Sequence, residues 1–169
     1  MRLCSLCERR CRIDRMSGKI GYCGIGKDSF VFKDFLQFGE EKEISPSYMV
    51  YLGGCNFRCS FCSVREFAFA QRTGNPVDSA KFAKRIQSVV KDVKTISFLG
   101  GEPTVNLFGI LKLLQKIKLK IPVVWNSNMF MTEGVLQIID QISDLYVTDF
   151  KFGNDECAKK IAQIENYTR

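Results

Sequence analysis

Apolar residues follow two different spacings over most of the chain. Short, nearly continuous apolar runs are typical of buried strands, and four of them occur, at residues 48–52, 95–99, 122–126 and 145–150. The segments between them carry apolar residues three or four positions apart, which predicts helices at residues 81–93, 110–117 and 132–142, with a further helical segment at 155–164. Asp78 or Ser79 is expected to cap the first helix and Thr132 the third. Strands that alternate with helices favour an α/β fold with parallel strands and right-handed crossovers.

The first 45 residues lack this periodicity and are expected to be rich in loops. They contain Cys4, Cys7, Cys11 and Cys23, with several glycines around the last of these. Four thiolates in a segment with so little apolar core predict a small fold built around a metal, either a structural zinc or a second iron–sulfur cluster. Free thiols without a metal are the third alternative. We therefore expect two parts, a Cys-rich head at residues 1–45 and an α/β core at residues 46–169.

Polar or metal-binding residues follow each of the four predicted strands. In folds of parallel strands the active site lies at the C-terminal strand ends, so these residues are expected to converge on one rim. They are a cysteine loop after the first strand, then Gly100, Gly101 and Glu102, then Asn126, Ser127 and Asn128, and finally Asp149 and Lys151. Each group also has a purely structural interpretation: a tight turn for the glycines, a solvated carboxylate for Glu102, turn residues for the asparagines, and a surface ion pair for Asp149 and Lys151.

The cysteine loop carries Cys55, Cys59 and Cys62 in a C-x3-C-x2-C spacing. A cubane [4Fe–4S] cluster normally takes four thiolates, so three closely spaced thiolates leave one iron open to a ligand from outside the protein. A zinc site and a set of buried thiols are the alternatives. Zinc requires a fourth ligand, and this loop offers no obvious one. The spacing therefore favours an iron–sulfur cluster that takes part in chemistry.

Composition narrows the possible functions. A chain of 169 residues with 46% apolar residues can form about one domain with a sizeable core. The sequence has no apolar signal segment and no run long enough to span a membrane, so a cytoplasmic location is expected, where clustered cysteines are metal ligands or catalytic groups rather than disulfides. The absence of histidine excludes His-based general base catalysis and His-ligated zinc. The net charge of +7 indicates a solvated basic surface, and without an RNA-binding motif nucleic acid is not expected as a partner.

Three features together resemble the radical S-adenosylmethionine (radical SAM) superfamily: the cysteine spacing, the aromatic Phe61 before the third cysteine, and the run Gly100, Gly101, Glu102. The resemblance implies a [4Fe–4S] cluster on Cys55, Cys59 and Cys62, with the amino and carboxylate groups of SAM on its open iron. It also implies that Phe61 packs near the adenine, that the Gly-Gly-Glu run holds the methionine amino group, and that Asn126 and Ser127 lie near the ribose or the methionine carboxylate. One electron from the reduced cluster would then split SAM into methionine and a 5′-deoxyadenosyl radical, which abstracts hydrogen from a substrate.

A narrower resemblance rests on residues 4–24 (CSLCERRCRIDRMSGKIGYCG), residues 53–62 (GGCNFRCSFC) and residues 149–158 (DFKFGNDECA). These runs are similar to the PflX-type homologues of pyruvate formate-lyase activating enzyme, in which the D-x-K run, here Asp149 and Lys151, lies in the SAM pocket. This resemblance implies a partial (βα) barrel and a glycine of a partner enzyme as the substrate, together with a reductase as electron donor. The family core usually has six βα units, so a chain that is truncated, or that pairs with another chain or a second copy across its open sheet edge, is expected. The alternative function is a non-catalytic metal-binding or electron-transfer protein.

Overall fold

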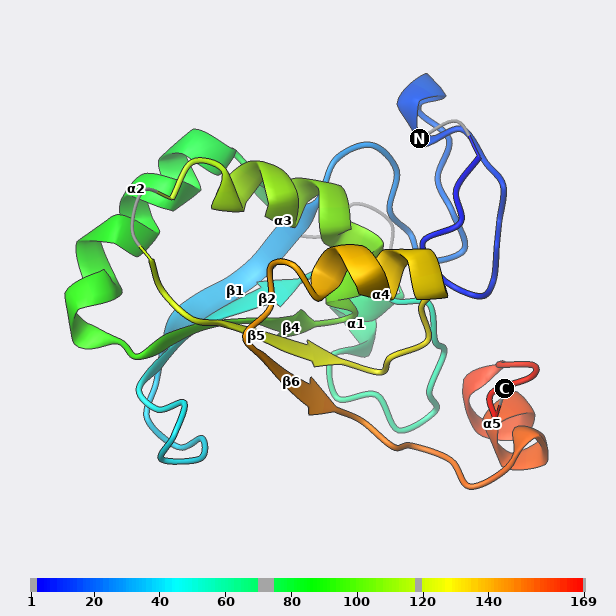
Figure 1. The fold of residues 1–169 in the computed structure, drawn as a ribbon. Coiled ribbons are helices and arrows are strands. Elements are labelled where there is room, and N and C mark those ends of the chain that lie inside the picture. Colours follow the sequence, from blue (N-terminus) through cyan, green and yellow to red (C-terminus); the bar gives the residue numbers. More distant parts are fainter. Residues whose placement is uncertain (1–2, 70–74, 118–119, 169) are drawn as a thin grey trace.

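A six-stranded sheet forms the centre of the molecule (Figure 1). The computed structural model describes residues 3–69, 75–117 and 120–168. The strand order is β3-β1-β2-β4-β5-β6. The strands span β1 (Phe30–Gln37), β2 (Ser47–Leu52), β3 (Asn75–Pro76), β4 (Thr95–Gly100), β5 (Val123–Ser127) and β6 (Leu145–Thr148). Strands β2, β4, β5 and β6 run parallel, as the sequence predicted, whereas β1 is antiparallel to both of its neighbours.

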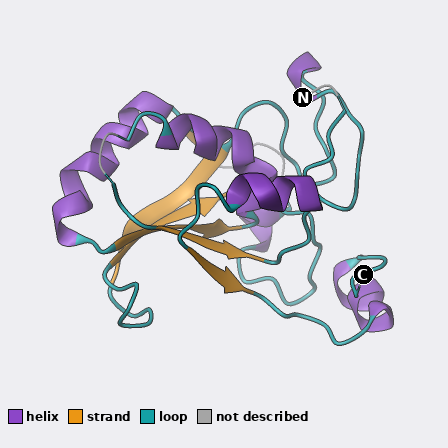
Figure 2. Ribbon diagram, in the orientation of Figure 1, coloured by secondary structure: helices purple, strands orange, loops and turns teal. Residues whose placement is uncertain are grey.

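Helices α2 (Ser79–Val89), α3 (Leu107–Leu114) and α4 (Glu133–Ile139) cover one face of the sheet (Figures 1 and 2). The other helical segments are α1 (Arg65–Ala68), α5 (Asp155–Ala162) and the short 3-10 turns η1 (Arg15–Ser17), η2 (Val90–Asp92) and η3 (Pro103–Asn106). Asp78 caps α2, because its carboxylate accepts hydrogen bonds from the N–H groups of Ala80 and Lys81. Thr132 occupies the N-cap of α4, but its hydroxyl donates to the carbonyl of Ser5 (2.9 Å) and so ties this helix to the head.

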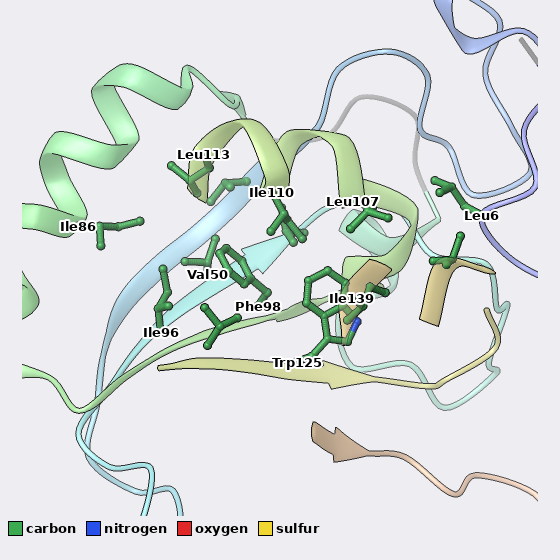
Figure 3. Close-up of a cluster of buried hydrophobic side chains, with 14 of the residues drawn as sticks. Leu6, Val50, Ile86, Ile96, Phe98, Leu107, Ile110, Leu113, Trp125 and Ile139 are labelled. Atoms are coloured by element: carbon green, nitrogen blue, oxygen red, sulfur yellow. The ribbon is translucent and has the colours of Figure 1, made fainter. Parts of the chain in front are cut away.

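The main core lies between the sheet and these three helices (Figure 3). Val50, Phe98 and Trp125 come from neighbouring strands and face Ile86 and Ile110 of the helices, all of them at most 1% exposed. Burying an apolar side chain of this size stabilises the fold by roughly 1.5–3 kcal/mol. This layer holds the strands in register, and it therefore fixes where their C-terminal ends lie. Over the described residues no helix has both the length and the apolar character needed to cross a bilayer.

Strand β1 is the main difference from the expected fold. The sequence predicted a loop-rich head, yet β1 pairs with β2 from Val31 to Gln37. A β-bulge between Val31 and Lys33 interrupts the pairing, and a bulge breaks the two-residue alternation by which a strand is recognised. The α/β fold with a largely parallel sheet is confirmed, with β1 and β3 as additional antiparallel strands. The division at residue 45 stays a prediction.

Candidate functional site

The C-terminal ends of the parallel strands β2, β4, β5 and β6 lie at one edge of the sheet, close to the head and to α5 (Figure 1). A cavity of about 220 Å³ opens there. Every one of the four strand ends contributes to its lining, which includes Cys55, Cys59, Phe61, Cys62, Gly100, Gly101, Glu102, Asn126, Asn128, Asp149 and Lys151. The structure thus brings together the residues that the sequence placed on one rim, except Ser127, which lies behind the lining.

The three cysteines of the loop after β2 face this common cavity. Cys55 and Cys59 are buried and Cys62 is half-buried. The sulfur of Cys55 accepts a hydrogen bond from the N–H of Phe57 (3.3 Å), a contact that stabilises a thiolate. Burial raises the pKa of the Cys55 thiol, and the nearby Glu102 carboxylate adds to this; burial also raises the pKa of Cys59, against the opposing effect of the Lys151 ammonium.

This donor set fits an iron–sulfur cluster better than a single metal ion. Within residues 3–69, 75–117 and 120–168, no three Cys, His, Asp or Glu side chains are gathered closely enough to ligate one ion. The thiolates of a cubane cluster bind different iron atoms, so they lie farther apart than the ligands of one zinc ion. Three thiols that line one cavity, with an N–H group donating to one sulfur, form a donor set that suits such a cluster.

Two other parts of the chain hold the cysteine loop in place. The N–H groups of Arg58 and Ser60 donate to the carbonyls of Ala162 and Ile161 at the C-terminal end of α5, both at 2.9 Å. The N–H of Cys55 donates to the carbonyl of Cys23 in the head (3.1 Å). The position of the loop therefore depends on segments more than 30 residues before it and about 100 residues after it.

Glycines allow the turn after β4 to lie directly against the cysteine loop. A Cβ atom at Gly101 would lie 2.0 Å from the carbonyl oxygen of Gly54, and one at Gly100 would lie 2.5 Å from the backbone nitrogen of Leu52. Gly100 also has a positive φ of 112°, a conformation that disfavours any side chain. The interpretation of these glycines as a tight turn is correct, and the turn forms one wall of the cavity.

Glu102 is buried, with 1% of its surface exposed. Its carboxylate accepts hydrogen bonds from the hydroxyl of Ser127 (2.8 Å) and from the N–H groups of Asn128 and Thr104 (each 3.0 Å). Burial raises the pKa of Glu102, although these donors oppose the effect. The interpretation as a solvated loop carboxylate is therefore wrong, and the predicted contact with a methionine amino group stays a prediction. Ser127 contributes to the site indirectly, because its hydroxyl donates a hydrogen bond to the Glu102 carboxylate.

Asp149 and Lys151 form an ion pair, with 2.9 Å between the Lys151 Nζ and an Asp149 carboxylate oxygen. Strand β6 ends at Thr148, so both residues lie in the segment that follows it. The intervening Phe150 points away from the cavity and is 86% exposed, whereas Asp149 and Lys151 line the cavity. Phe61 also lines it and is 60% exposed. Asp149 and Lys151 therefore form the predicted ion pair and also line the cavity, as the sequence predicted for a site at this strand end.

Two buried asparagines that the sequence did not single out organise the site. The side chain of Asn56 donates to the carbonyl of Phe130 (3.0 Å) and accepts from the amide of Asn128 (2.8 Å). The side chain of Asn106 donates to the carbonyls of Gly53 (2.8 Å) and Glu102 (3.1 Å), and so joins the cysteine loop to the turn after β4. The only hint in the sequence is the position of Asn56 directly after Cys55.

The head places its four cysteines around one small cavity of about 10 Å³, which Cys4, Cys7, Cys11 and Cys23 all line. Burial raises the pKa of the Cys7 thiol to about 11. The buried Arg15 donates to the sulfur of Cys23 (3.2 Å) and to the carbonyl of Val105 in η3 (2.8 Å). A metal in the head stays a prediction. Cys157 is exposed on α5, away from both groups of cysteines.

Comparison with known proteins agrees with this geometry. Residues 49–169 match the radical SAM superfamily. A protein of Methanocaldococcus jannaschii that is described as uncharacterized is 38% identical over 97% of this chain, which corresponds to 50% of that protein. A 7-carboxy-7-deazaguanine synthase of Methanopyrus kandleri is 27% identical over 72% of this chain and 56% of its own length. The chain thus spans about half the length of the curated relatives it matches.

The family match covers β2 to α5 and includes all four strand ends that form the cavity. It agrees with the incomplete barrel of parallel strands seen in the structure. The match is to the superfamily as a whole, so membership of the PflX-type subgroup stays a prediction. The chain belongs to the radical SAM superfamily, whose membership implies a [4Fe–4S] cluster and S-adenosylmethionine.

Proposed function

We propose that this chain carries the cofactor site of an enzyme that cleaves S-adenosylmethionine reductively. The observation that supports this most directly is the single cavity lined by the three loop cysteines, the Gly-Gly-Glu turn, and residues from the ends of β5 and β6. When bound, the reduced cluster supplies one electron to SAM, which yields methionine and a 5′-deoxyadenosyl radical that abstracts hydrogen from a substrate. The protein contributes orientation and exclusion of water.

Several residues that line the cavity have a role in this proposal, and the chemistry of each side chain supports its role. Cys55, Cys59 and Cys62 hold the cluster. The Gly100–Gly101 turn exposes backbone groups to the ligand because no side chain covers them, and Glu102 lies beside it as an acceptor for an ammonium group. The Lys151 ammonium attracts a carboxylate.

Three further residues complete the proposed SAM site. The amide of Asn126 offers a donor and an acceptor for hydroxyl groups, and Ser127 orients Glu102 through its 2.8 Å hydrogen bond. The exposed ring of Phe61 offers an apolar surface for a base.

The substrate is proposed by analogy alone. The Asp149 and Lys151 run favours a glycine of a partner enzyme, as in the activases that it resembles. The relative from Methanopyrus kandleri bears the name of a small-molecule enzyme, so a small molecule is the competing proposal. Deuterium transfer from a Cα-deuterated glycine peptide into 5′-deoxyadenosine would support the glycine substrate. If no glycine peptide of the partner enzyme transfers deuterium, the glycine substrate is contradicted, whereas the proposal that the chain cleaves SAM is unaffected.

The head is proposed to bind a metal through Cys4, Cys7, Cys11 and Cys23, either a structural zinc or a second iron–sulfur cluster, because all four line one cavity. The thiols are not gathered closely enough for one ion as they stand, so a zinc ion would have to draw them together. Metal analysis of the purified protein tests this. One zinc per chain, or iron beyond that of the loop cluster, that disappears in Cys7→Ser but persists in Cys157→Ser supports the proposal, and the absence of both contradicts it.

The outer edge of β6 pairs with no strand in the part of the chain that the structure describes. Its Leu145 is 40% exposed. We propose that a second polypeptide, either another copy or a partner chain, covers this edge. Analytical ultracentrifugation of the purified protein tests the first of these, and a monomer at high concentration would contradict it.

The proposed activity is tested by anaerobic reconstitution with iron and sulfide, reduction with dithionite, and an assay for 5′-deoxyadenosine from SAM. Cys59→Ala is expected to lose the cluster absorbance and the product, whereas Cys157→Ala, which removes an exposed cysteine, is expected to retain both. A cluster that persists after all three loop cysteines are replaced would contradict the assignment. A stable cluster with no SAM binding by calorimetry would favour the alternative, an electron-transfer protein.

A further inference from the structure

Two guanidinium groups lie over the aromatic ring of Tyr22, in the head. The Cζ of Arg9 is 3.6 Å from the ring centroid, and the Cζ of Arg58, in the cysteine loop, is 4.3 Å from it. A cation over the face of an aromatic ring is attracted by the ring quadrupole. The ring therefore holds two positive groups close together, where they would otherwise repel each other, and it does so beside the cysteine loop.

Both guanidinium groups donate hydrogen bonds to the backbone of that loop. Arg58 donates to the carbonyls of Cys55 (2.7 Å) and Phe57 (2.8 Å). Arg9 donates from Nε to the carbonyl of Asn56 (2.6 Å). Three successive carbonyls, beginning at the first cluster cysteine, thus accept hydrogen bonds from fixed cations. Charge-assisted bonds of this kind are about twice as strong as neutral ones.

The same two arginines and Tyr22 connect the loop to the rest of the site. Arg58 also donates to the carbonyl of Tyr22. The Tyr22 hydroxyl donates to the side chain of Gln163 at the end of α5 (3.0 Å), and Arg9 donates to the Gln163 carbonyl. Head, cysteine loop and α5 are therefore held together at one point.

In the part of the chain that the structure describes, no carboxylate forms an ion pair with Arg9 or Arg58. The ion pairs found among the described residues involve Arg10, Arg85, Lys151 and Lys159, and neither Arg9 nor Arg58. Both side chains are half-buried, so solvent screens their charge less than it screens that of an exposed lysine. Their combined positive potential reaches the loop that carries Cys55.

We propose that Arg9 and Arg58, stacked on Tyr22, are positioning residues that raise the reduction potential of the cluster held by this loop. The inference rests on the proposed function, because it requires the cluster. The reduced cluster carries one more negative charge than the oxidised cluster, so nearby cations stabilise the reduced form, and net charge and hydrogen bonding around a cluster are known to set its potential. The electron comes from an external reductant.

The test is an anaerobic redox titration of the reconstituted chain, in which the electron paramagnetic resonance signal of the reduced cluster is followed and the iron content is measured. In the double variant Arg9→Gln/Arg58→Gln, the ratio of reduced to oxidised cluster at a fixed potential is expected to fall on the order of tenfold. For a one-electron couple this corresponds to about 59 mV. Arg9→Gln alone is expected to give a smaller fall, and Arg9→Lys, which keeps the charge, is expected to restore the wild-type value.

Two controls separate this effect from general changes in the protein. Tyr22→Phe keeps the stacked ring and is expected to leave the potential unchanged. Lys112→Gln removes one positive charge from an exposed position on α3, in the helix layer outside the sheet, and is also expected to have no effect. A shift in Lys112→Gln as large as in Arg9→Gln would overturn the proposal, because net charge alone would then explain both.

An unchanged potential in the double variant, at full iron content, overturns the proposal. If the double variant does not assemble a cluster, the comparison of Arg9→Gln with Arg9→Lys decides: unequal potentials support the proposal and equal ones overturn it. A wild-type chain that assembles no cluster contradicts the proposed function itself. A wild-type chain that cleaves SAM, together with variants of unchanged potential, overturns only the role of the arginines.

Discussion

Replacement of Gly101 by alanine tests the close contact between the turn after β4 and the cysteine loop. The added Cβ would lie 2.0 Å from the carbonyl oxygen of Gly54 and 2.7 Å from its carbonyl carbon. Favourable contacts between heavy atoms lie near 3.5–4.0 Å. Because both neighbours are backbone atoms, no change of side-chain rotamer relieves the overlap, and the two segments must move apart.

The size of the effect follows from this geometry. Overpacking typically destabilises a protein by about 1–3 kcal/mol, and a contact with backbone places Gly101→Ala at about 3 kcal/mol. For a chain of this size the midpoint of thermal unfolding then falls by roughly 6–12 °C. Gly134 in α4 is the matched control, because nothing lies within 4 Å of its added Cβ and its φ is negative. Gly134→Ala is expected to stabilise the helix by about 0.5–1 kcal/mol.

Urea unfolding followed by circular dichroism measures both variants, and the iron content after reconstitution reports on the cysteine loop. Gly101→Ala is expected to lower both the free energy of unfolding and the iron content, whereas Gly134→Ala lowers neither. A Gly101→Ala variant as stable as the wild type, with full iron content, would refute the reasoning, because it would show that the turn and the loop are free to separate.

Three further predictions concern buried groups. Glu102→Gln is expected to lower the free energy of unfolding by about 1–3 kcal/mol, since the new amide places N–H donors where the carboxylate accepts three hydrogen bonds; a variant as stable as the wild type in urea would contradict this. Burial and the hydrogen bond to Asp34 raise the pKa of Tyr48, so the folded state keeps a proton that the unfolded chain releases above about pH 10, and stability should fall there by about 1.4 kcal/mol per pH unit. Between pH 9 and 11 the summed loss is about 1.4 kcal/mol, so urea unfolding should show a fall of this size in the wild type and a smaller one in Tyr48→Phe, and equal falls would argue against it. Ile86→Ala in the core, where the side chain is fully buried, should cost about 2–5 kcal/mol, whereas Ile138→Ala at a position 44% exposed should cost far less, and similar losses would contradict the described core.

The sequence determined the parallel part of the sheet and the helices that cover it. Apolar periodicity predicted the places of strands β2, β4, β5 and β6 and of helices α2, α3 and α4. Each of these elements buries one face, and the buried face determines the spacing of apolar residues along a short stretch of sequence. The sequence also indicated the chemistry, since the spacing of Cys55, Cys59 and Cys62 is local and the rule for parallel strands places strand ends together.

Other features depended on contacts between distant segments. Strand β1 was not predicted because its bulge breaks the alternation and because its ladder pairs with β2, a separate segment of the chain. Ser127 directly follows Asn126 in the sequence, yet Asn126 lines the cavity and Ser127 faces Glu102, since successive side chains of a strand point to opposite faces. The burial of Glu102 likewise depends on hydrogen-bond donors from two separate segments, Thr104 in one and Ser127 and Asn128 in the other.

What the sequence by itself determined is therefore the order and direction of the core elements and the presence of a thiolate-rich loop at a strand end, because these follow from periodicity and spacing over short stretches. The tertiary structure alone decided how that loop is held. Arg9, Tyr22 and Asn106 meet the loop from positions far apart in the chain, and Gln163 binds Arg9 and Tyr22. Nothing in the local sequence of these four residues marks them. Hydrogen bonds and cation–π contacts between such residues form only once the core has brought their backbones together, so only the folded chain reveals them.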